Sequence, residues 1–321
     1  MSVERTAPDF LIVGAPKAGS TALHDALATH PQLYASPVKE PKFFLTNGVP
    51  PARSAHRGPG DAHSAREWVW QPERYHQLFA DAPADTLCFE STPFYLWHRA
   101  SHERIARVLP HAKLIAIIRD PIDRAFSNWT HLRADGLEPE PDFLRACRLE
   151  PERIAKGWAP FWRYLQLGRY GEQFSSLFRH VDPARVRVVR YRELVDTPRR
   201  TLDELCVFLG VDTGVLAGLP DSNVGRWAAD GWLNAALRGV IGFGAAAGAY
   251  VRPAIWRSAE RPLLAVLQRG GTPRPRLEQD VRAQLVTHYA GDNALLARML
   301  GRDFSDWLAI EGRGTYTVRR S

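Results

Sequence analysis

The stretch "FLIVGAPKAGST" at residues 10–21 decides the fold of this 321-residue chain. Residues 10–13 form a continuous apolar run that ends in a glycine, which is typical of a strand buried on both faces of a parallel sheet. After the loop, residues 20–29 place Leu23 and Leu27 on one stripe of a helix. The stretch is therefore predicted to be a strand, a loop and a helix, which together open a βα unit.

The loop between this strand and helix has the composition of a phosphate-binding turn. In such a turn, backbone N–H groups and the first helical turn present unpaired donors to one concave site. Gly14 and Gly19 permit a tight backbone. Ser20, Thr21 and Lys17 add two hydroxyl donors and a full positive charge. We therefore predict that the loop binds a phosphate ester, and a plain strand-to-helix turn is the simplest alternative.

The position of the lysine separates this loop from the G-x-x-x-x-G-K-[ST] loop of nucleotide triphosphatases. There the lysine follows the last glycine and reaches the β- and γ-phosphates. Here Ser20 follows Gly19, and Lys17 lies inside the loop. A triphosphate would lose its main charge partner, so a nucleotide kinase or triphosphatase with a displaced lysine is kept as the alternative function.

A second βα unit is predicted from the stretch "KLIAIIRDPIDRAFSNW", residues 113–129. Residues 113–118 are a buried strand, and a helix follows. Asp120 suits the helix N-cap and Pro121 the first turn. Asp123 occupies the N3 position, from which a carboxylate can reach back to the cap.

Arg119 and Ser127 are candidate anion ligands on this second unit. Arg119 follows the strand at its carboxyl end, where open α/β sheets bind ligands. Ser127 lies seven positions after Asp120, on the same side of the helix and roughly 10 Å along its axis. A guanidinium and a hydroxyl can then grip one phosphate from two directions. The alternatives are an ion pair of Arg119 with a neighbouring aspartate and a plain surface serine.

Strand and helix patterns alternate along the rest of the chain. Strands are expected at residues 32–36, 86–90 and 185–191, helices at 71–79, 161–178, 197–210 and 277–300, and a long loop at 50–65. Thr197 is expected to cap its helix and Gly210 to end it. We predict one single-domain α/β fold, a three-layer α/β/α arrangement around a mostly parallel sheet. It comprises a core at about 8–213 and a helical region at about 214–321.

The cysteine content, the apolar segments and the net charge of the chain limit the classes of protein to which it can belong. The three cysteines match neither a disulfide framework nor a metal spacing, and no apolar leader precedes the first strand, so a cytoplasmic protein is expected. The longest apolar run, residues 239–251, is too short to span a bilayer and is expected to be a buried helix or an acceptor or membrane contact. The net charge of +7 favours anionic ligands, but no motif indicates a nucleic-acid partner.

Two motifs together resemble the sulfotransferases that use 3′-phosphoadenosine-5′-phosphosulfate. The stretch "PKAGST" matches their P-K-x-G-[ST]-[ST] loop throughout, and Arg119 and Ser127 match their arginine and serine eight residues apart. The segments "ESTPFYL" at 90–96 and "LLARMLGRDFSDW" near the end also resemble this family. The resemblance runs from about residue 8 to 213 and implies the P-loop-like sulfotransferase fold.

The resemblance also implies which residues bind the donor. The 5′-phosphosulfate would lie on Pro16, Lys17, Ala18, Gly19, Ser20 and Thr21. Arg119 and Ser127 would bind the 3′-phosphate, and Lys17 would stabilise the bridging oxygen, with no metal demanded. The family's C-terminal closing loop reads R-x-G-x-x-G or K-G-R, whereas this chain has "RGGTPRPR". Arg274 is assigned to the 3′-phosphate, and Arg269 is the alternative.

The stretch "SPVKEPKFF" at residues 36–44 resembles the K-E-x-x-F-F segment of bacterial and heparan-type sulfotransferases. That resemblance makes Glu40 the general base and Lys42 a possible contact of the acceptor or the sulfate. A solvated glutamate paired to Lys39 or Lys42 is the competing interpretation, and His98 is the alternative base.

The acceptor is expected to be a hydroxyl or an amine of a carbohydrate, lipid or natural product. The family resemblance implies that a sulfuryl group is transferred to such a hydroxyl or amine, and that adenosine 3′,5′-bisphosphate is the product. Heparan-type enzymes carry a lysine where this chain has Ser91, which argues against an acidic sugar of their kind. The sequence indicates neither the identity of the acceptor nor an oligomeric state.

Overall fold

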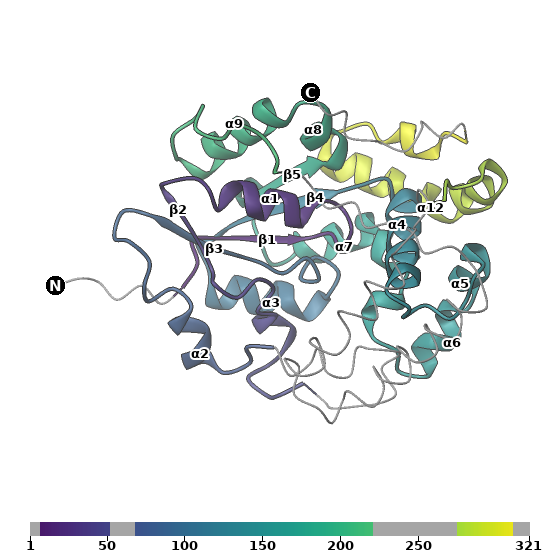
Figure 1. Ribbon diagram of the computed structural model, residues 1–321, viewed down its shortest axis with the longest axis horizontal. Coiled ribbons are helices and arrows are strands. Elements are labelled where there is room, and N and C mark those ends of the chain that lie inside the picture. The colour runs from purple at the N-terminus through teal and green to yellow at the C-terminus, as the bar shows by residue number, and fades with distance from the viewer. Residues whose placement is uncertain (1–6, 52–67, 221–274, 311–321) are drawn as a thin grey trace.

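The computed structural model describes residues 7–51, 68–220 and 275–310. At its centre lies a five-stranded sheet with the strand order β2-β3-β1-β4-β5, and each pair of neighbouring strands in it is parallel. The strands are β1 (Phe10–Gly14), β2 (Leu33–Ala35), β3 (Leu87–Ser91), β4 (Lys113–Ile118) and β5 (Val186–Arg190). Because all five run in one direction, their carboxyl ends meet at one edge of the sheet (Figure 1).

Helices cover both faces of this sheet. They are α1 (Ser20–Leu27), α2 (Pro72–Gln77), α3 (Arg99–Val108), α4 (Pro121–Ala134), α5 (Phe143–Arg148), α6 (Glu150–Ala155), α7 (Tyr170–Leu177), α8 (Tyr191–Asp196), α9 (Pro198–Leu209) and α12 (Gln279–Leu300). Figure 1 shows α1 and α9 on one face and α2 and α3 on the other, with α4 and α12 beyond the carboxyl edge. The predicted α/β fold with a parallel central sheet is confirmed.

The strands form where continuous apolar runs were found. Phe10, Leu11 and Ile12 of β1 have no exposed surface, and the same holds for residues 114–118 of β4. Central strands covered on both faces bury every side chain, which is why the alternation of apolar and polar residues is missing. The strands expected at 32–36, 86–90, 113–118 and 185–191 are all present, within a residue or two of the expected bounds.

The helix termini agree with the sequence only in part. Asp120 caps α4 by accepting the N–H groups of residues 122 and 123, and Gly210 ends α9 with a φ of 86°. Asp123, however, does not reach back to the cap, because its carboxylate binds Arg282. Thr197 makes no side-chain cap of α9; its hydroxyl donates to the carbonyl of Glu193 instead.

The prediction of a single helix over residues 161–178 is wrong. Two short 3-10 turns, η3 (Pro160–Trp162) and η4 (Gln166–Gly168), precede α7. The Glu150 carboxylate accepts the N–H groups of Leu165 and Gln166, which supplies partners that a continuous helix would have to provide. A Cβ at Gly168 would lie 2.8 Å from the Cβ of Pro121, so the turn also packs too closely on α4 for a larger residue.

Several expectations lie outside the described residues. These are the apolar segment 239–251, Arg269, Arg274 and most of the loop 50–65. The division into a core and a helical region, and the single-domain organisation itself, stay predictions. Within the described ranges, no helix combines the length and the apolar character needed to cross a bilayer.

Candidate functional site

The phosphate-binding loop joins β1 to α1 at the carboxyl edge of the sheet. Gly19 has a φ of 99° and Lys17 a φ of 64°, so two loop residues adopt the left-handed conformation. A Cβ at Gly14 would lie 2.6 Å from the Cβ of Leu96, because Leu96 packs directly on the loop. The tight backbone that the two glycines were expected to permit is therefore present. Glycine is required at both positions, because of the close packing at Gly14 and the positive φ at Gly19.

The loop presents unpaired donors at the start of α1. The first helical hydrogen bond runs from the N–H of Leu23 to the carbonyl of Gly19. Among the described residues, the N–H groups of Gly19, Ser20 and Thr21 have no hydrogen-bond partner. Lys17 is half-buried beside them. A helix N-terminus with unpaired N–H groups and a nearby ammonium can bind a phosphate.

Pro16 and Ala18 are buried, whereas Thr21 is exposed. The side chains of the two buried residues therefore pack into the fold, so only their backbone could contact a ligand. Ser20 is buried at 6% exposure, at the first position of α1.

Arg119 lies at the carboxyl end of β4, as expected. Its guanidinium carbon is 4.9 Å from the ring centroid of Tyr191. No ion pair joins it to Asp120 or Asp123 in the part of the chain that the structure describes, because both carboxylates bind Arg282. Stacking leaves the N–H groups at the edge of the guanidinium directed away from the ring, where a phosphate can accept them. Ser127 is half-buried on α4.

Tyr191, at the start of α8, connects the phosphate loop to Arg119. A Cβ at Gly19 would lie 2.9 Å from the Cδ2 of Tyr191, so the loop touches the same ring on which Arg119 stacks. The sequence placed Tyr191 only at the end of a strand. An aromatic residue directly after a strand whose carboxyl end lies at this edge is the signal that could have indicated it.

Arg282 of α12 holds the start of α4. It donates to the carboxylates of Asp120 and Asp123 and to the carbonyls of Trp307 and Ala309, at 5% exposure. Burial, together with the neighbouring Asp123, raises the pKa of Asp120 to about 6, and Arg282 opposes this shift. The N-cap beside Arg119 is therefore fixed by a side chain from the far end of the sequence.

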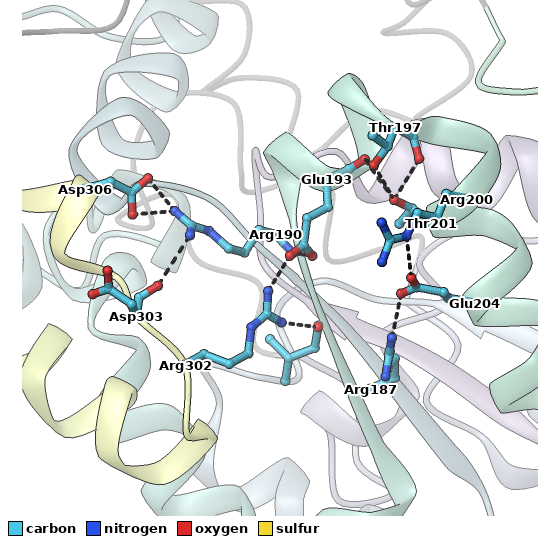
Figure 2. Close-up of polar contacts among 11 residues, drawn as sticks. Arg187, Arg190, Glu193, Thr197, Arg200, Thr201, Glu204, Arg302, Asp303 and Asp306 are labelled. Carbon is cyan, nitrogen blue, oxygen red and sulfur yellow. Dashed lines mark hydrogen bonds and ion pairs between the residues drawn. The ribbon is translucent and has the colours of Figure 1, made fainter.

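Further ion pairs fasten the C-terminal segment to β5 and α8 (Figure 2). Arg190 donates to both carboxylate oxygens of Asp306, at 2.6 and 2.5 Å. Arg302 donates to the carboxylate of Glu193 and, at 2.9 Å, to the carbonyl of Val188. These contacts hold α8, the helix that begins with Tyr191, whose ring lies against the guanidinium of Arg119.

Glu40 lies in a strained loop after β2. It has a φ of 58° although a proline follows it, and Lys42 has a φ of 60°. The N–H of Lys42 donates to the hydroxyl of Thr92 at 3.3 Å, and the carbonyl of Pro41 accepts the N–H of Val69 at 2.9 Å. No ion pair within 4 Å joins Glu40 to Lys39 or Lys42 in the described ranges, although the charge of Glu40 acts to raise the pKa of Lys39 against the burial that lowers it.

Glu90 supports this loop from below and was not among the predicted site residues. It is fully buried and accepts the hydroxyls of Tyr95 at 2.7 Å, Thr92 at 2.9 Å and Tyr75 at 3.3 Å. Burial raises its pKa to about 7, although the three hydrogen bonds lower it. Because Thr92 also accepts from Lys42, Glu90 fixes the backbone two residues after Glu40.

His98 and Ser91 are each held by a specific partner. His98 is half-buried at the start of α3, 2.8 Å from the hydroxyl of Ser101, and burial lowers its pKa to about 4. Ser91 is fully buried at the end of β3, and its hydroxyl lies 2.7 Å from Nδ1 of His24. A long lysine side chain in place of Ser91 would disrupt this buried contact.

Comparison with known proteins agrees with this geometry. The family described as "Sulfotransferase family" matches residues 8–214. The heparan sulfate glucosamine 3-O-sulfotransferase 3B1 of Mus musculus is 28% identical over 205 residues, which are 64% of this chain and 46% of the relative. The bifunctional heparan sulfate N-deacetylase/N-sulfotransferase 3 of Homo sapiens is 28% identical over 211 residues, 64% of this chain and 22% of the relative.

Among solved structures, the sulfotransferase from Alicyclobacillus acidocaldarius has a TM-score of 0.71 and 26% identity. The match covers 94% of this chain and 98% of that one. The chain belongs to the sulfotransferase family. It spans less than half the length of the two heparan sulfate relatives named above.

Proposed function

We propose that this chain transfers a sulfuryl group from 3′-phosphoadenosine-5′-phosphosulfate to a hydroxyl or amine. One observation carries the proposal. The unpaired N–H groups at the start of α1 lie beside Lys17, and the ring of Tyr191 touches both this loop and Arg119. Two cationic sites on one sheet edge suit a nucleotide that carries phosphate groups at two separate positions.

The residues present fit this donor. The loop at residues 16–21 would bind the 5′-phosphosulfate through its free N–H groups and the hydroxyls of Ser20 and Thr21. Arg119 and Ser127 would bind the 3′-phosphate, since the guanidinium is not neutralised by either neighbouring aspartate. A triphosphate loop would instead need a lysine directly after Gly19, where this chain has Ser20.

The proposed step is an in-line displacement at sulfur. The bond from sulfur to the acceptor oxygen or nitrogen forms while the bond to the bridging oxygen breaks, and adenosine 3′,5′-bisphosphate leaves. Lys17 stabilises the negative charge that develops on the bridging oxygen. Glu40 takes the proton of the acceptor, a role that suits a carboxylate without a direct ion pair to Lys39 or Lys42 among the described residues.

A carbohydrate is the acceptor class that the relatives favour. The names of both heparan sulfate relatives specify sulfation of glucosamine units or of heparan sulfate, at oxygen in one case and at nitrogen in the other. We propose that the acceptor of this chain is likewise a glycosyl group or a conjugate that carries one.

A turnover assay tests the proposed activity. Release of adenosine 3′,5′-bisphosphate from the phosphosulfate donor would be followed without metal, with glycosides, alcohols, phenols and amines as acceptors. ATP with Mg²⁺ would be tested in parallel. We expect bisphosphate release that depends on an acceptor, and no ATP turnover. Turnover of ATP without turnover of the phosphosulfate would contradict the proposal and favour the kinase or triphosphatase alternative.

A further inference from the structure

A buried carboxylate with three hydroxyl partners lies next to the loop that follows β2. Glu90 of β3 has no exposed surface. Its Oε1 accepts the hydroxyls of Tyr95 at 2.7 Å and Tyr75 at 3.3 Å, and its Oε2 accepts the hydroxyl of Thr92 at 2.9 Å. Among the described residues, no cation forms an ion pair with Glu90. These four residues are called the hydroxyl network below.

Two of these hydroxyls also bind the backbone of the loop. The hydroxyl oxygen of Thr92 accepts the N–H of Lys42, and that of Tyr95 accepts the N–H of Phe44, both at 3.3 Å. A carboxylate accepts hydrogen bonds but donates none, so an ionised Glu90 makes both hydroxyls point their hydrogen atoms toward it. Their lone pairs then face the two N–H groups. The ionised carboxylate therefore sets the direction of both contacts with the loop.

The loop needs such contacts because its backbone is strained. Glu40 and Lys42 have φ angles of 58° and 60°, which residues other than glycine keep only where the surrounding contacts impose them. At the far end of the loop, two side chains of α3 donate to the carbonyl of Phe44, at 2.9 and 3.0 Å. Nearer to Glu40, the loop is held by the N–H of Val69 and the hydroxyl of Thr92. Of these two contacts, the second depends on the buried carboxylate.

Protonation of Glu90 changes the number of hydrogen atoms in the network. Burial, and to a smaller extent the charge of Glu40, raises the pKa of Glu90 to about 7. Three hydroxyls supply three hydrogens to three contacts, and the added proton is a fourth. Because Oε1 accepts two hydroxyls and Oε2 only one, we expect the proton on Oε2, which faces Thr92. The Thr92 hydroxyl must then accept from Glu90, and its own hydrogen turns toward the side from which the N–H of Lys42 approaches.

The ionisable groups around Glu90 come from several segments. Burial raises the pKa values of Tyr75 of α2 and Tyr95 well above their usual range, so both hydroxyls stay protonated and continue to donate. The loop adds the negative charge of Glu40, and β1 places the apolar Leu11 beside Glu90. Other ionisable side chains of the adjoining segments contact partners of their own: Lys42 the ring of Trp68, Arg104 the carbonyl of Phe44, and His24 the hydroxyl of Ser91. Within the hydroxyl network, the group that changes charge near neutral pH is therefore the carboxyl itself.

We propose that Glu90 is a positioning residue for Glu40: its ionised form holds the loop in the geometry that transfer requires, and its protonated form loosens the loop. Because Glu90 is fully buried, it acts through the hydroxyls of Thr92 and Tyr95 and not by touching a substrate. The inference rests on the proposed function only where it names Glu40 as the general base. Donor affinity should not depend on Glu90, because neither the phosphate loop nor Arg119 belongs to the hydroxyl network.

Hydrogen exchange of single N–H groups, followed by NMR, tests the effect on the loop without any turnover. The protection of the Lys42 N–H, relative to an unstructured peptide at the same pH, would be measured at pH 8 and at pH 5.5. Because one hydrogen bond is weakened, we expect protection in the wild type to fall by about tenfold at pH 5.5. Glu90→Gln, whose neutral amide carries hydrogens of its own, should show the low value at both pH values. Thr92→Val should do the same, whereas Thr92→Ser keeps the hydroxyl and should behave like the wild type.

Steady-state kinetics at the same two pH values test the consequence for the reaction. At pH 8, kcat of Glu90→Gln should be about tenfold lower than that of the wild type, and the ratio should approach one at pH 5.5, where Glu90 of the wild type is protonated. The KM for the phosphosulfate donor and the affinity for adenosine 3′,5′-bisphosphate should be those of the wild type. A merely structural role would give a ratio that is the same at both pH values.

Glu138→Gln is the matched control. Glu138 is a second buried glutamate that accepts a tyrosine hydroxyl, that of Tyr164 at 2.5 Å, and it lies outside the hydroxyl network. This variant should keep the protection of Lys42 and its dependence on pH. The proposal is overturned if the wild type protects Lys42 equally at both pH values, if Glu90→Gln protects it as the wild type does, or if the kcat ratio is independent of pH. A pH-dependent loop in a chain that transfers no sulfuryl group would contradict the proposed function and not the action of Glu90 on the loop.

Discussion

The two cationic ends of the candidate donor site are supported in different ways. The phosphate loop after β1 is held mainly by residues from the first 120 positions, such as Leu96 against Gly14 and the carbonyl of Ile117, which accepts the N–H of Ala15, with Tyr191 against Gly19 as a further contact. The Arg119 end depends on Arg282, which lies more than 150 residues further along the chain and binds the N-cap of α4. The first end is a local motif, and the second is assembled by tertiary contacts.

Because the two ends are held by different segments, we expect substitutions in these segments to affect the two ends differently. Loss of Arg282 should disturb the Arg119 end while leaving the loop between β1 and α1 in place. Changes near Leu96 should do the reverse. Tyr191 belongs to both ends, because it touches Gly19 and stacks on Arg119.

The largest effect is expected from Arg282→Met. It leaves the largely buried carboxylate of Asp120 and the half-exposed carboxylate of Asp123 without their guanidinium partner, and the loss of a partner from a buried ion pair typically costs about 3–5 kcal/mol. We expect a lower free energy of unfolding in urea and a weaker affinity for adenosine 3′,5′-bisphosphate. Arg282→Lys should restore part of both.

Arg153→Met is the matched control for this change. Arg153 forms a buried ion pair with Glu138, at 2.6 Å, away from the sheet edge. The Arg153→Met variant should lose a similar amount of stability. The folded variant should nevertheless bind the bisphosphate with unchanged affinity. Equal losses of affinity in both variants would mean that Arg282 has no special connection to the Arg119 end.

Lys17→Ala should have the next largest effect, on turnover and not on binding. Removing one preorganised cationic group from a developing charge typically lowers turnover by about 10²–10³-fold. Because the N–H groups of the loop remain, donor affinity should change by less than about tenfold. Steady-state kinetics and calorimetry measure the two quantities, and Lys156→Ala, at an exposed lysine paired with Glu152, is the control. Turnover like that of the wild type would rule out the assigned role.

The free energy of unfolding is expected to depend on pH through His102, which lies behind the phosphate loop, with an effect of similar size. This histidine is fully buried, its Nε2 donates to the carbonyl of Leu96, and burial lowers its pKa to about 4. The unfolded chain takes up the proton near pH 6.5, so the stabilisation is present above that pH. It is lost as the pH falls towards 4, by up to about 3 kcal/mol.

The difference between wild type and His102→Asn isolates this contribution. Glu90 acts in the opposite direction, because its pKa is raised to about 7, so the wild-type curve alone would mix the two. Urea unfolding at pH 7.5, 6 and 5 should show the wild type losing its advantage over the variant as the pH falls. A difference that does not change with pH would contradict the burial of a neutral imidazole.

The smallest expected effect is that of Arg119→Ala on donor affinity. One lost charge-assisted contact costs about 1.5–3 kcal/mol, which is roughly tenfold or more in the dissociation constant. Arg187→Ala, at an exposed arginine of β5 paired with Glu204, should leave the affinity unchanged. If both variants bind alike, Arg119 does not contact the nucleotide.

The parts of the fold that the sequence predicted are those decided by local patterns. Apolar runs located the strands, and the glycines and hydroxyl residues located the loop before α1. The helix expected at 161–178 failed because Glu150 captures the N–H groups of the chain from outside the segment. No local pattern reveals such a contact.

The same limit applies to the candidate site. Lys17, Arg119 and Glu40 were named from motifs and their resemblance to a family. Tyr191 and Arg282 could not be named, because their importance depends on which segments meet at the sheet edge. Side chains that support a site from distant positions have no required spacing from its motif.

Calorimetric titration with adenosine 3′,5′-bisphosphate in the absence of Mg²⁺ tests the central claim most directly. If the two ends form one site, the bisphosphate should bind with a one-to-one stoichiometry. It should also bind more tightly than ATP with Mg²⁺, and more tightly than adenosine 5′-phosphate, which lacks the group for Arg119. Equal affinity for all three nucleotides, or no heat of binding for the bisphosphate, would contradict the account.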